Sequence, residues 1–407
     1  MIAQTIAEKI LSKKAGYTVQ AGDLCIVPVN GCMATDTTAP LAIKAFEAMG
    51  GTKLFDAKKF HLIIDHAAPA PNERIANLHT LMRNFATQHG CNLYDVGSGI
   101  CHQVMVDNAH VKPSDIFIGA DSHTPVYGAL NAFACGVGST DLAAVMLTGK
   151  IWLKVPQTIK IILQGVLPKH TSGKDLALYI GKQLTISGAT YKAVEYCGEA
   201  IEALNLSQRM ALCNMSAELG AKTGLVHAKG LKLPYNFEPT FADEGANYIK
   251  TLTIDVSELQ MQIAIPNSPD DVHDATNFAG TKITYGFIGT CVNGRLDDLQ
   301  AAAEVLKGKK IASGVRLVIG PASRQVFLDA LANGTIHTLV QAGASIINSG
   351  CGPCVGSHEG VPGDGEVVIS SANRNFKGRM GNPNAQIYLG SPRLVALSVL
   401  HGCITCS

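Results

Sequence analysis

The chain has 407 residues, of which 47% are hydrophobic and 16% are charged, and its formal net charge is +1. This composition is typical of a well-buried globular enzyme of two or three domains, and it excludes a disordered or fibrous chain. The balanced charge and the lack of a long basic run exclude the electrostatic footprint of a nucleic-acid-binding protein. No uncharged apolar stretch is long enough to predict a membrane span, so we expect neither nucleic acid nor a membrane as partner.

The first ten residues predict an amphipathic helix and not a signal peptide, because they lack a basic segment followed by an apolar one. Twelve cysteines in a long chain without such a signal favour reduced thiols, metal or cluster ligation, and a cytoplasmic location. Several cysteines are expected to be buried small hydrophobic residues, namely Cys25, Cys91, Cys135, Cys197 and Cys213.

The first part of the chain alternates apolar runs with helical stretches. Strands are predicted at residues 23–29, 60–65 and 115–120. A helix opens at residues 40–46, with a proline in its first turn, and another covers residues 72–88 with apolar side chains at helical spacing. Such alternation predicts an α/β fold with a mostly parallel sheet covered by helices.

Two further regions of the chain also contain predicted strands, and the third alternates them with helices. The second opens with a predicted strand at residues 158–165 and ends in a polar linker at residues 267–271. The third repeats strand, loop and helix, with helices at 296–306 and 323–331 and a strand at 316–319. We therefore predict three α/β domains, which cover residues 1–155, 156–270 and 271–407.

Polar motifs follow three of the predicted strands directly. Asp65-His66 ends one strand, Asp121-Ser122-His123 ends another, and Cys291 follows a strand at residues 283–289. In parallel sheets, ligand-binding groups gather just beyond the carboxyl ends of the strands. These motifs are therefore candidates for one functional site.

Three cysteines give the most specific signal. Cys351 and Cys354 form a C-x2-C pair in a glycine-rich segment, and Cys291 lies in a second such segment. Three thiolates are one too few for a closed zinc site, but they suit a cubane iron–sulfur cluster whose open iron acts as a Lewis acid. From spacing alone, a zinc site completed by the pair Cys403 and Cys406 and a redox dithiol remain alternatives.

Six motifs together resemble the aconitase superfamily in nearly the whole chain. They lie at residues 99–103, 119–124, 213–220, 289–295, 350–356 and 373–379. The resemblance implies a three-domain core that lacks the family's mobile fourth domain. The length is similar to that of the large subunits of two-subunit hydro-lyases of the 3-isopropylmalate dehydratase and homoaconitase type.

The resemblance also implies one [4Fe–4S] cluster per subunit, held by Cys291, Cys351 and Cys354, with one iron not ligated by the protein. That iron would bind a carboxylate and the hydroxyl of a hydroxy acid and would stabilise the departing oxygen. His66 would be the general acid, oriented by Asp65, because a carboxylate raises the pKa of an imidazole and fixes its tautomer.

The remaining site residues have three implied roles. The other catalytic residues would be His102, Asp121, His123 and Glu218. The substrate would be bound by Asp36, Thr38, Ser122, Arg374 and Arg379, and the arginines can clamp carboxylates through paired hydrogen bonds. The environment of the cluster would include Asn214, Asn293 and Asn373.

Two departures from the family pattern bear on the substrate. Thr35 replaces a glutamine that lies near the substrate in aconitase, which argues against citrate. No region matches the fourth domain, so a separate small subunit is expected to supply the catalytic base and most of the specificity.

The implied reaction is the reversible dehydration and isomerisation of a malate-type dicarboxylate. The first candidate is the pair 2-isopropylmalate and 3-isopropylmalate in leucine synthesis. Homoaconitate and methyl- or dimethylmalates are alternatives. A non-catalytic metal-binding or RNA-binding regulator is the alternative of another class.

Overall fold

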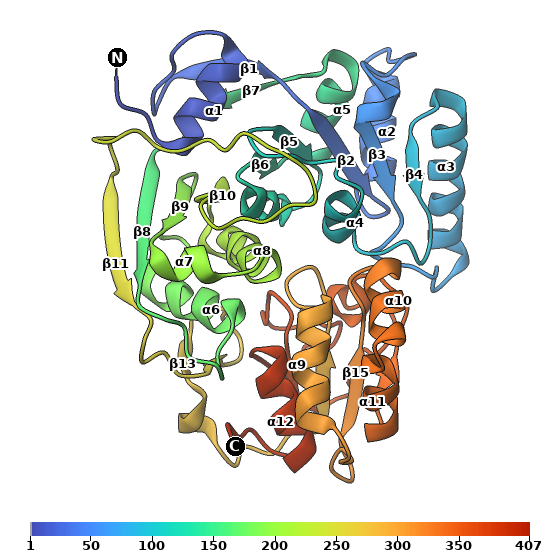
Figure 1. Cartoon of the computed structure of the whole chain (residues 1–407). Helices are drawn as coiled ribbons and strands as arrows, with labels where there is room; N and C mark the ends of the chain where they lie inside the picture. Colours follow the sequence, from blue (N-terminus) through green and yellow to red (C-terminus); the bar gives the residue numbers. More distant parts are fainter. Residues whose placement is uncertain (1) are drawn as a thin grey trace.

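The computed structural model describes residues 2–407, which form three α/β bodies, each built on its own main sheet (Figure 1). The α/β class that the strand–helix alternation predicts is confirmed. Among the described residues, no helix combines the length and the apolar character that a membrane crossing requires.

The first body has a five-stranded sheet in which every neighbouring pair is parallel. Its strands, in spatial order, are β4 (Asn92–Tyr94), β3 (Phe60–Ile63), β2 (Gly31–Thr35), β5 (Ile116–Gly119) and β6 (Phe133–Gly136). Its helical segments are α1 (Ile6–Ala15), α2 (Ala39–Ala48), η1 (Ala57–Lys59), α3 (Glu73–His89), α4 (Cys101–Asp107), η2 (Thr124–Leu130) and α5 (Ser139–Thr148). The predicted strands at 60–65 and 115–120 and both predicted helices are confirmed.

Two predictions in this body need correction. The strand predicted at 23–29 exists as β1 (Leu24–Pro28), but it pairs antiparallel with β7 (Lys150–Lys154) in a separate ribbon. The N-terminal helix begins at Ile6, because Thr5 and Glu8 form a capping box that fixes its start.

The second body has a four-stranded parallel sheet. Its strands, in spatial order, are β10 (Thr223–Val226), β9 (Ala193–Cys197), β8 (Thr158–Gln164) and β11 (Lys250–Asp255). Its helical segments are α6 (Gly173–Leu184), α7 (Glu199–Ala203), α8 (Leu206–Met215) and η3 (Ser216–Leu219). The predicted strand at 158–165 is confirmed as β8.

The third body has a seven-stranded mixed sheet. Its strands, in spatial order, are β13 (Val272–Asp274), β12 (Gln262–Ala264), β18 (Gln386–Leu389), β17 (Val367–Ser370), β14 (Tyr285–Ile288), β15 (Arg316–Ile319) and β16 (Ser345–Ile346). Its helical segments are η4 (Ala275–Phe278), α9 (Leu296–Leu306), α10 (Arg324–Ala332), α11 (Thr335–Ala342), η5 (Gly352–Val355) and α12 (Pro392–His401). Since β12 pairs with β18, this sheet already begins before the linker at 267–271.

The predicted burial of five cysteines is confirmed for three of them. Cys25, Cys135 and Cys213 are buried, whereas Cys91 and Cys197 are half-buried. Cys91 directly precedes the edge strand β4, and Cys197 is the last residue of β9.

The first and second bodies pack through a close approach of their backbones. A Cβ atom added to Gly128 in η2 would lie 1.5 Å from the carbonyl oxygen of Gly224 in β10. No side chain fits there, so glycine at 128 sets the distance between the two bodies.

We therefore expect Gly128→Ala to destabilise the protein by about 1–3 kcal/mol or more, because overpacking forces backbone shifts. The measurement is the urea midpoint of unfolding. Gly181→Ala is the matched control, since its Cβ would meet no atom closer than 3.9 Å and alanine favours the helix. Equal midpoints for the two variants would refute this account of the interface.

Candidate active site

A buried cavity lies between the carboxyl ends of strands from the first and third sheets. The lining segments follow β3, β4 and β5 on one side and β14, β16 and β17 on the other. This is where parallel sheets bind ligands. The cavity is lined by His66, Ile100, Cys101, His102, Asp121, His123, Thr290, Cys291, Cys351, Cys354, Val355, Asn373 and Arg379.

A backbone hydrogen bond joins the two halves of this cavity. The N–H of Cys351 donates to the carbonyl oxygen of Asp65 at 2.8 Å. A Cβ on Gly350 would lie 2.8 Å from the same oxygen, so the close approach requires glycine. The C-x2-C loop is therefore tied directly to the loop that carries His66.

Asp65 fixes the orientation of His66. One oxygen of its fully buried carboxylate bonds His66 Nδ1 at 2.8 Å, and the other accepts the N–H of Cys101 at 2.7 Å. Because Nδ1–H is donated to the carboxylate, Nε2 of His66 is the nitrogen available for exchange of a proton.

Asp121 lies between two imidazoles. Its carboxylate oxygens bond Nε2 of His102 at 2.8 Å and Nε2 of His66 at 3.3 Å. Burial would raise the pKa of Asp121, but the charge and hydrogen bond of His102 and the bond to His66 hold that pKa well below its usual range. Conversely, burial would lower the pKa of His66, but Cys351, Asp65 and Asp121 raise it well above its usual value.

A second ion-pair network borders the cavity. Nε2 of His123 bonds Oε1 of Glu218 at 2.9 Å, and Nε of Arg374 donates to both oxygens of the same carboxylate at 2.8 Å. Arg374 also reaches the hydroxyl of the exposed Ser122 at 3.1 Å. Burial would raise the pKa of Glu218, but the bonds to His123 and Arg374 hold it below its usual value.

Polar side chains surround the cysteine sulfurs. Nδ2 of Asn373 lies 3.6 Å from Sγ of Cys291 and also bonds the side-chain oxygen of Asn214. The guanidinium of Arg379 lies 3.5 Å from Sγ of Cys354. These N–H groups are suited to stabilise negative charge on sulfur.

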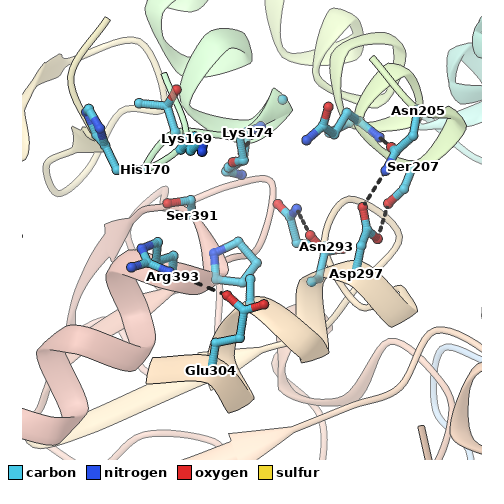
Figure 2. Close-up of a pocket in the computed structure, with 18 residues that line it drawn as sticks. Lys169, His170, Lys174, Asn205, Ser207, Asn293, Asp297, Glu304, Ser391 and Arg393 are labelled. Carbon is cyan, nitrogen blue, oxygen red and sulfur yellow. Dashed lines mark hydrogen bonds and ion pairs between the residues drawn. The ribbon is translucent and has the colours of Figure 1, made fainter. Parts of the chain in front are cut away.

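Asn293 does not line the cysteine cavity. Its Nδ2 donates to Asp298 at 2.9 Å, and the side chain faces a second cavity of about 220 Å³ between the second and third bodies (Figure 2). Figure 2 shows that this cavity also holds Lys169 and the ion pair of Arg393 with Glu304. The structure therefore does not bring Asn293 to the cysteine sulfurs.

Four of the five expected substrate contacts do not line the cysteine cavity, namely Asp36, Thr38, Ser122 and Arg374. Thr38 shares an open groove with Asp121 and Ser122 at the border between the first and second bodies. Asp36 is 3% exposed, and its carboxylate accepts backbone N–H groups inside the first body. Thr38 therefore faces solvent near the site, and Asp36 does not.

The sequence reasoning missed three residues of the site and its surroundings. Cys101 lines the cavity, and Tyr127 places its hydroxyl 3.3 Å from Nδ1 of His102. Lys174 is fully buried, and its ammonium donates to the carbonyl oxygen of Ala372 at 2.6 Å. Cys101 could have been found in the motif at 99–103, whereas nothing in the local sequence distinguishes Lys174 from a surface lysine.

The donor set fits a cluster better than a single ion. In a tetrahedral zinc site the sulfur atoms would lie about 4 Å apart, because each Zn–S bond is about 2.3 Å. Within residues 2–407, no group of three candidate ligand atoms within 4.8 Å of one another contains two of Cys291, Cys351 and Cys354. All three cysteines line one cavity, which suits an inorganic core that several thiolates bind together.

The C-terminal cysteines cannot complete this site. Cys403 pairs with Lys282, which precedes the amino end of β14, whereas Cys291 follows the carboxyl end of the same strand. The four residues of β14 span about 13 Å, and the two cysteines lie beyond opposite ends of this strand. The four-cysteine zinc alternative is therefore not supported.

Comparisons with known proteins agree with this geometry. The chain is 43% identical to 3-isopropylmalate dehydratase large subunit 1 of Methanopyrus kandleri, over 99% of each chain. It is 45% identical to the 3-isopropylmalate dehydratase large subunit of Elusimicrobium minutum, over 99% of this chain and 98% of the relative. It is 44% identical to the homoaconitase large subunit of Thermus thermophilus, over 99% of this chain and 97% of the relative.

A solved structure, aconitase X of Thermococcus kodakaraensis in its holo form, shares the fold with a TM-score of 0.51 at 15% identity. The match covers 86% of this chain and 84% of that one. The family model described as "Aconitase family (aconitate hydratase)" matches residues 8–402. The chain therefore belongs to the aconitase family of hydro-lyases.

Proposed function

We propose that this chain is the large, catalytic subunit of an iron–sulfur hydro-lyase that reversibly dehydrates a malate-type dicarboxylic acid. The observation that carries the proposal is one buried cavity in which the motif cysteines Cys291, Cys351 and Cys354 meet three carboxylate-bound histidines. The relatives named 3-isopropylmalate dehydratase favour 2-isopropylmalate and 3-isopropylmalate as substrates. The relative named homoaconitase, at similar identity, favours homoaconitate as the second candidate.

Cys291, Cys351 and Cys354 would hold one [4Fe–4S] cluster. Since a fully ligated cluster takes four cysteines, these three would leave one iron without a protein ligand. When bound, that iron supplies Lewis-acid assistance to the departing hydroxyl. The amide of Asn373 would stabilise the anionic sulfur of Cys291, and the guanidinium of Arg379 that of Cys354.

The acid–base role falls to His66. Asp65 holds Nδ1, so Nε2 can deliver a proton to the departing oxygen, and Asp121 stabilises the charged imidazolium before transfer. His102 shares Asp121 and keeps that carboxylate in place. The proton thus leaves from Nε2 of His66, and the carboxylates of Asp65 and Asp121 fix the orientation of this imidazole.

Arginine side chains at the open edge of the cavity would bind the substrate carboxylates. Arg374 uses Nε for Glu218, which leaves the other guanidinium nitrogens free to face Ser122 and a ligand. Arg379 lines the cavity, and its Nε has no hydrogen-bond partner among the described residues. Both can form paired hydrogen bonds with a carboxylate.

The partner would be a small subunit that brings the catalytic base and closes the site. The relatives above are named as large subunits, and this chain spans nearly all of each of them. The open groove beside Thr38, Asp121 and Ser122 leaves the site accessible to such a partner.

We expect Cys354→Ser to lose the cluster and the hydro-lyase activity while the fold survives, because serine differs from cysteine by one atom and two of the three hydrophobic clusters contain none of the cavity cysteines. Iron, acid-labile sulfide and the circular dichroism spectrum of anaerobically reconstituted protein provide the measurement. Cys135→Ala, which removes a buried thiol outside the cavity, should retain iron and sulfide. Full iron and sulfide content in Cys354→Ser would contradict the assignment of ligands.

His66→Gln should lower kcat by about 10²- to 10⁴-fold, the usual contribution of a general acid, and should leave the cluster in place. The measurement is steady-state dehydration by the cluster-loaded complex, with iron content determined on the same sample. His273→Gln is the control, since the half-buried His273 does not line the cysteine cavity and forms its ion pair with Asp271. A kcat within threefold of wild type would remove His66 from the mechanism.

Reconstitution with the small subunit tests the reaction and its substrate. The chain alone should show no turnover, and the complex should convert 3-isopropylmalate or homoaconitate faster than citrate, as followed by the ultraviolet absorbance of the unsaturated acid. Turnover by the chain alone would contradict the need for a partner. No turnover of any substituted malate by a cluster-loaded complex would contradict the reaction class.

A further inference from the structure

Asp36 directly follows β2 and lies beside the end of β3, because these strands pair in parallel with Thr35 opposite Ile63. Its carboxylate points into the first body and is 3% exposed. This position is incompatible with direct contact to a substrate in the cysteine cavity, which Asp36 does not line.

Three consecutive backbone N–H groups after β3 converge on this carboxylate. Oδ1 accepts the N–H of Asp65 at 3.1 Å and that of His66 at 2.8 Å, and Oδ2 accepts the N–H of Ala67 at 2.8 Å. Beyond the end of a strand such groups have no sheet partner, and together they form an anion-binding nest. Asp36 occupies that nest and thereby fixes the backbone that carries His66.

His79 holds Asp36 from the other side. It lies in α3, is 2% exposed, and places Nε2 3.3 Å from Oδ2 of Asp36. Burial would raise the pKa of Asp36, but the bonds to His79 and to the backbone of His66 and Ala67 hold it below its usual range. The carboxylate is thus ionised and accepts four hydrogen bonds.

The same loop is held by the third body on its opposite face. The carbonyl of Asp65 accepts the N–H of Cys351, and the carbonyl of Ala68 accepts Nδ2 of Asn348 at 3.1 Å. The loop of residues 65–68 is therefore clamped between Asp36 and the cysteine loop. A shift of Asp36 would therefore change both the position of His66 relative to Asp121 and its position relative to Cys351.

We infer that Asp36, steadied by His79, is a positioning residue that sets the His66 loop for proton transfer, in place of the substrate-binding role that the family resemblance implies. This inference rests on the proposed function, since it assigns Asp36 to the acid–base step of the same site. A displacement of the reacting nitrogen by about 1 Å can cost about 10²-fold in rate.

The test is Asp36→Asn in the cluster-loaded complex with its small subunit. An amide presents an N–H₂ group to part of the nest, so at least one backbone N–H loses its acceptor. We expect kcat to fall by about 10- to 100-fold with KM changed by less than about threefold and with iron and sulfide unchanged. Hydrogen exchange should speed up in the peptide that contains residues 64–68.

Matched variants separate positioning from a general loss of stability. Glu195→Gln removes another buried carboxylate that accepts a backbone N–H, and it should leave kcat unchanged. His79→Gln retains a donor and should keep most of the activity, whereas His79→Phe should lower kcat without changing KM.

Two outcomes would overturn the inference while the wild-type complex is active: a kcat of Asp36→Asn within threefold of wild type, or an equal loss in Glu195→Gln. An increase confined to KM would also overturn it, because it would indicate a substrate contact. An inactive wild-type complex would instead refute the proposed function, and the hydrogen-exchange comparison would then still report whether Asp36 holds the loop.

Discussion

The hydrogen bond between the N–H of Cys351 and the carbonyl of Asp65 is the interaction on which the site depends. It is one of several backbone hydrogen bonds between the first and third bodies, and it brings the loop that carries His66 into contact with the cysteine loop. The carboxylate of Asp65 then serves His66 and the N–H of Cys101 at once. Asp65 therefore couples the orientation of the His66 imidazole to the position of the proposed metal ligand Cys351.

The two carboxylates Asp121 and Glu218 can be buried because each is paired with basic side chains. Asp121 lies between His66 and His102, and Glu218 lies between His123 and Arg374, so neither carboxylate is left without a partner in the interior. Pairing also holds these side chains in single positions, which suits groups that must act on one substrate oxygen. The exposed Ser122 and the open groove beside it leave one side of the network free for a substrate and a partner.

Much of this arrangement could be predicted from the sequence, because strand ends and cysteine spacing are local features. The strand positions of β5, β8 and β15 and the grouping of Asp65, His66, Asp121 and Cys291 followed from apolar runs that end in polar motifs. Pairing partners did not follow: an apolar run specifies a buried strand but not its neighbour, so the separate β1–β7 ribbon and the addition of β12 to the third sheet were missed. The directions of Asn293 and Asp36 were missed for a related reason, since a motif gives the position of a residue in the chain and not the side toward which it points.

The central claim is that an iron without a protein ligand lies beside His66 and meets the substrate. The most direct measurement is the Mössbauer spectrum of the anaerobic protein reconstituted with 57Fe, recorded with and without a saturating substituted malate. We expect a [4Fe–4S] spectrum in which one iron of four changes its isomer shift when the malate binds, because the three proposed ligands Cys291, Cys351 and Cys354 leave one iron without a thiolate. A spectrum in which no iron changes its isomer shift when the malate is added would contradict this prediction. A site that binds zinc and contains no inorganic sulfide would also contradict it.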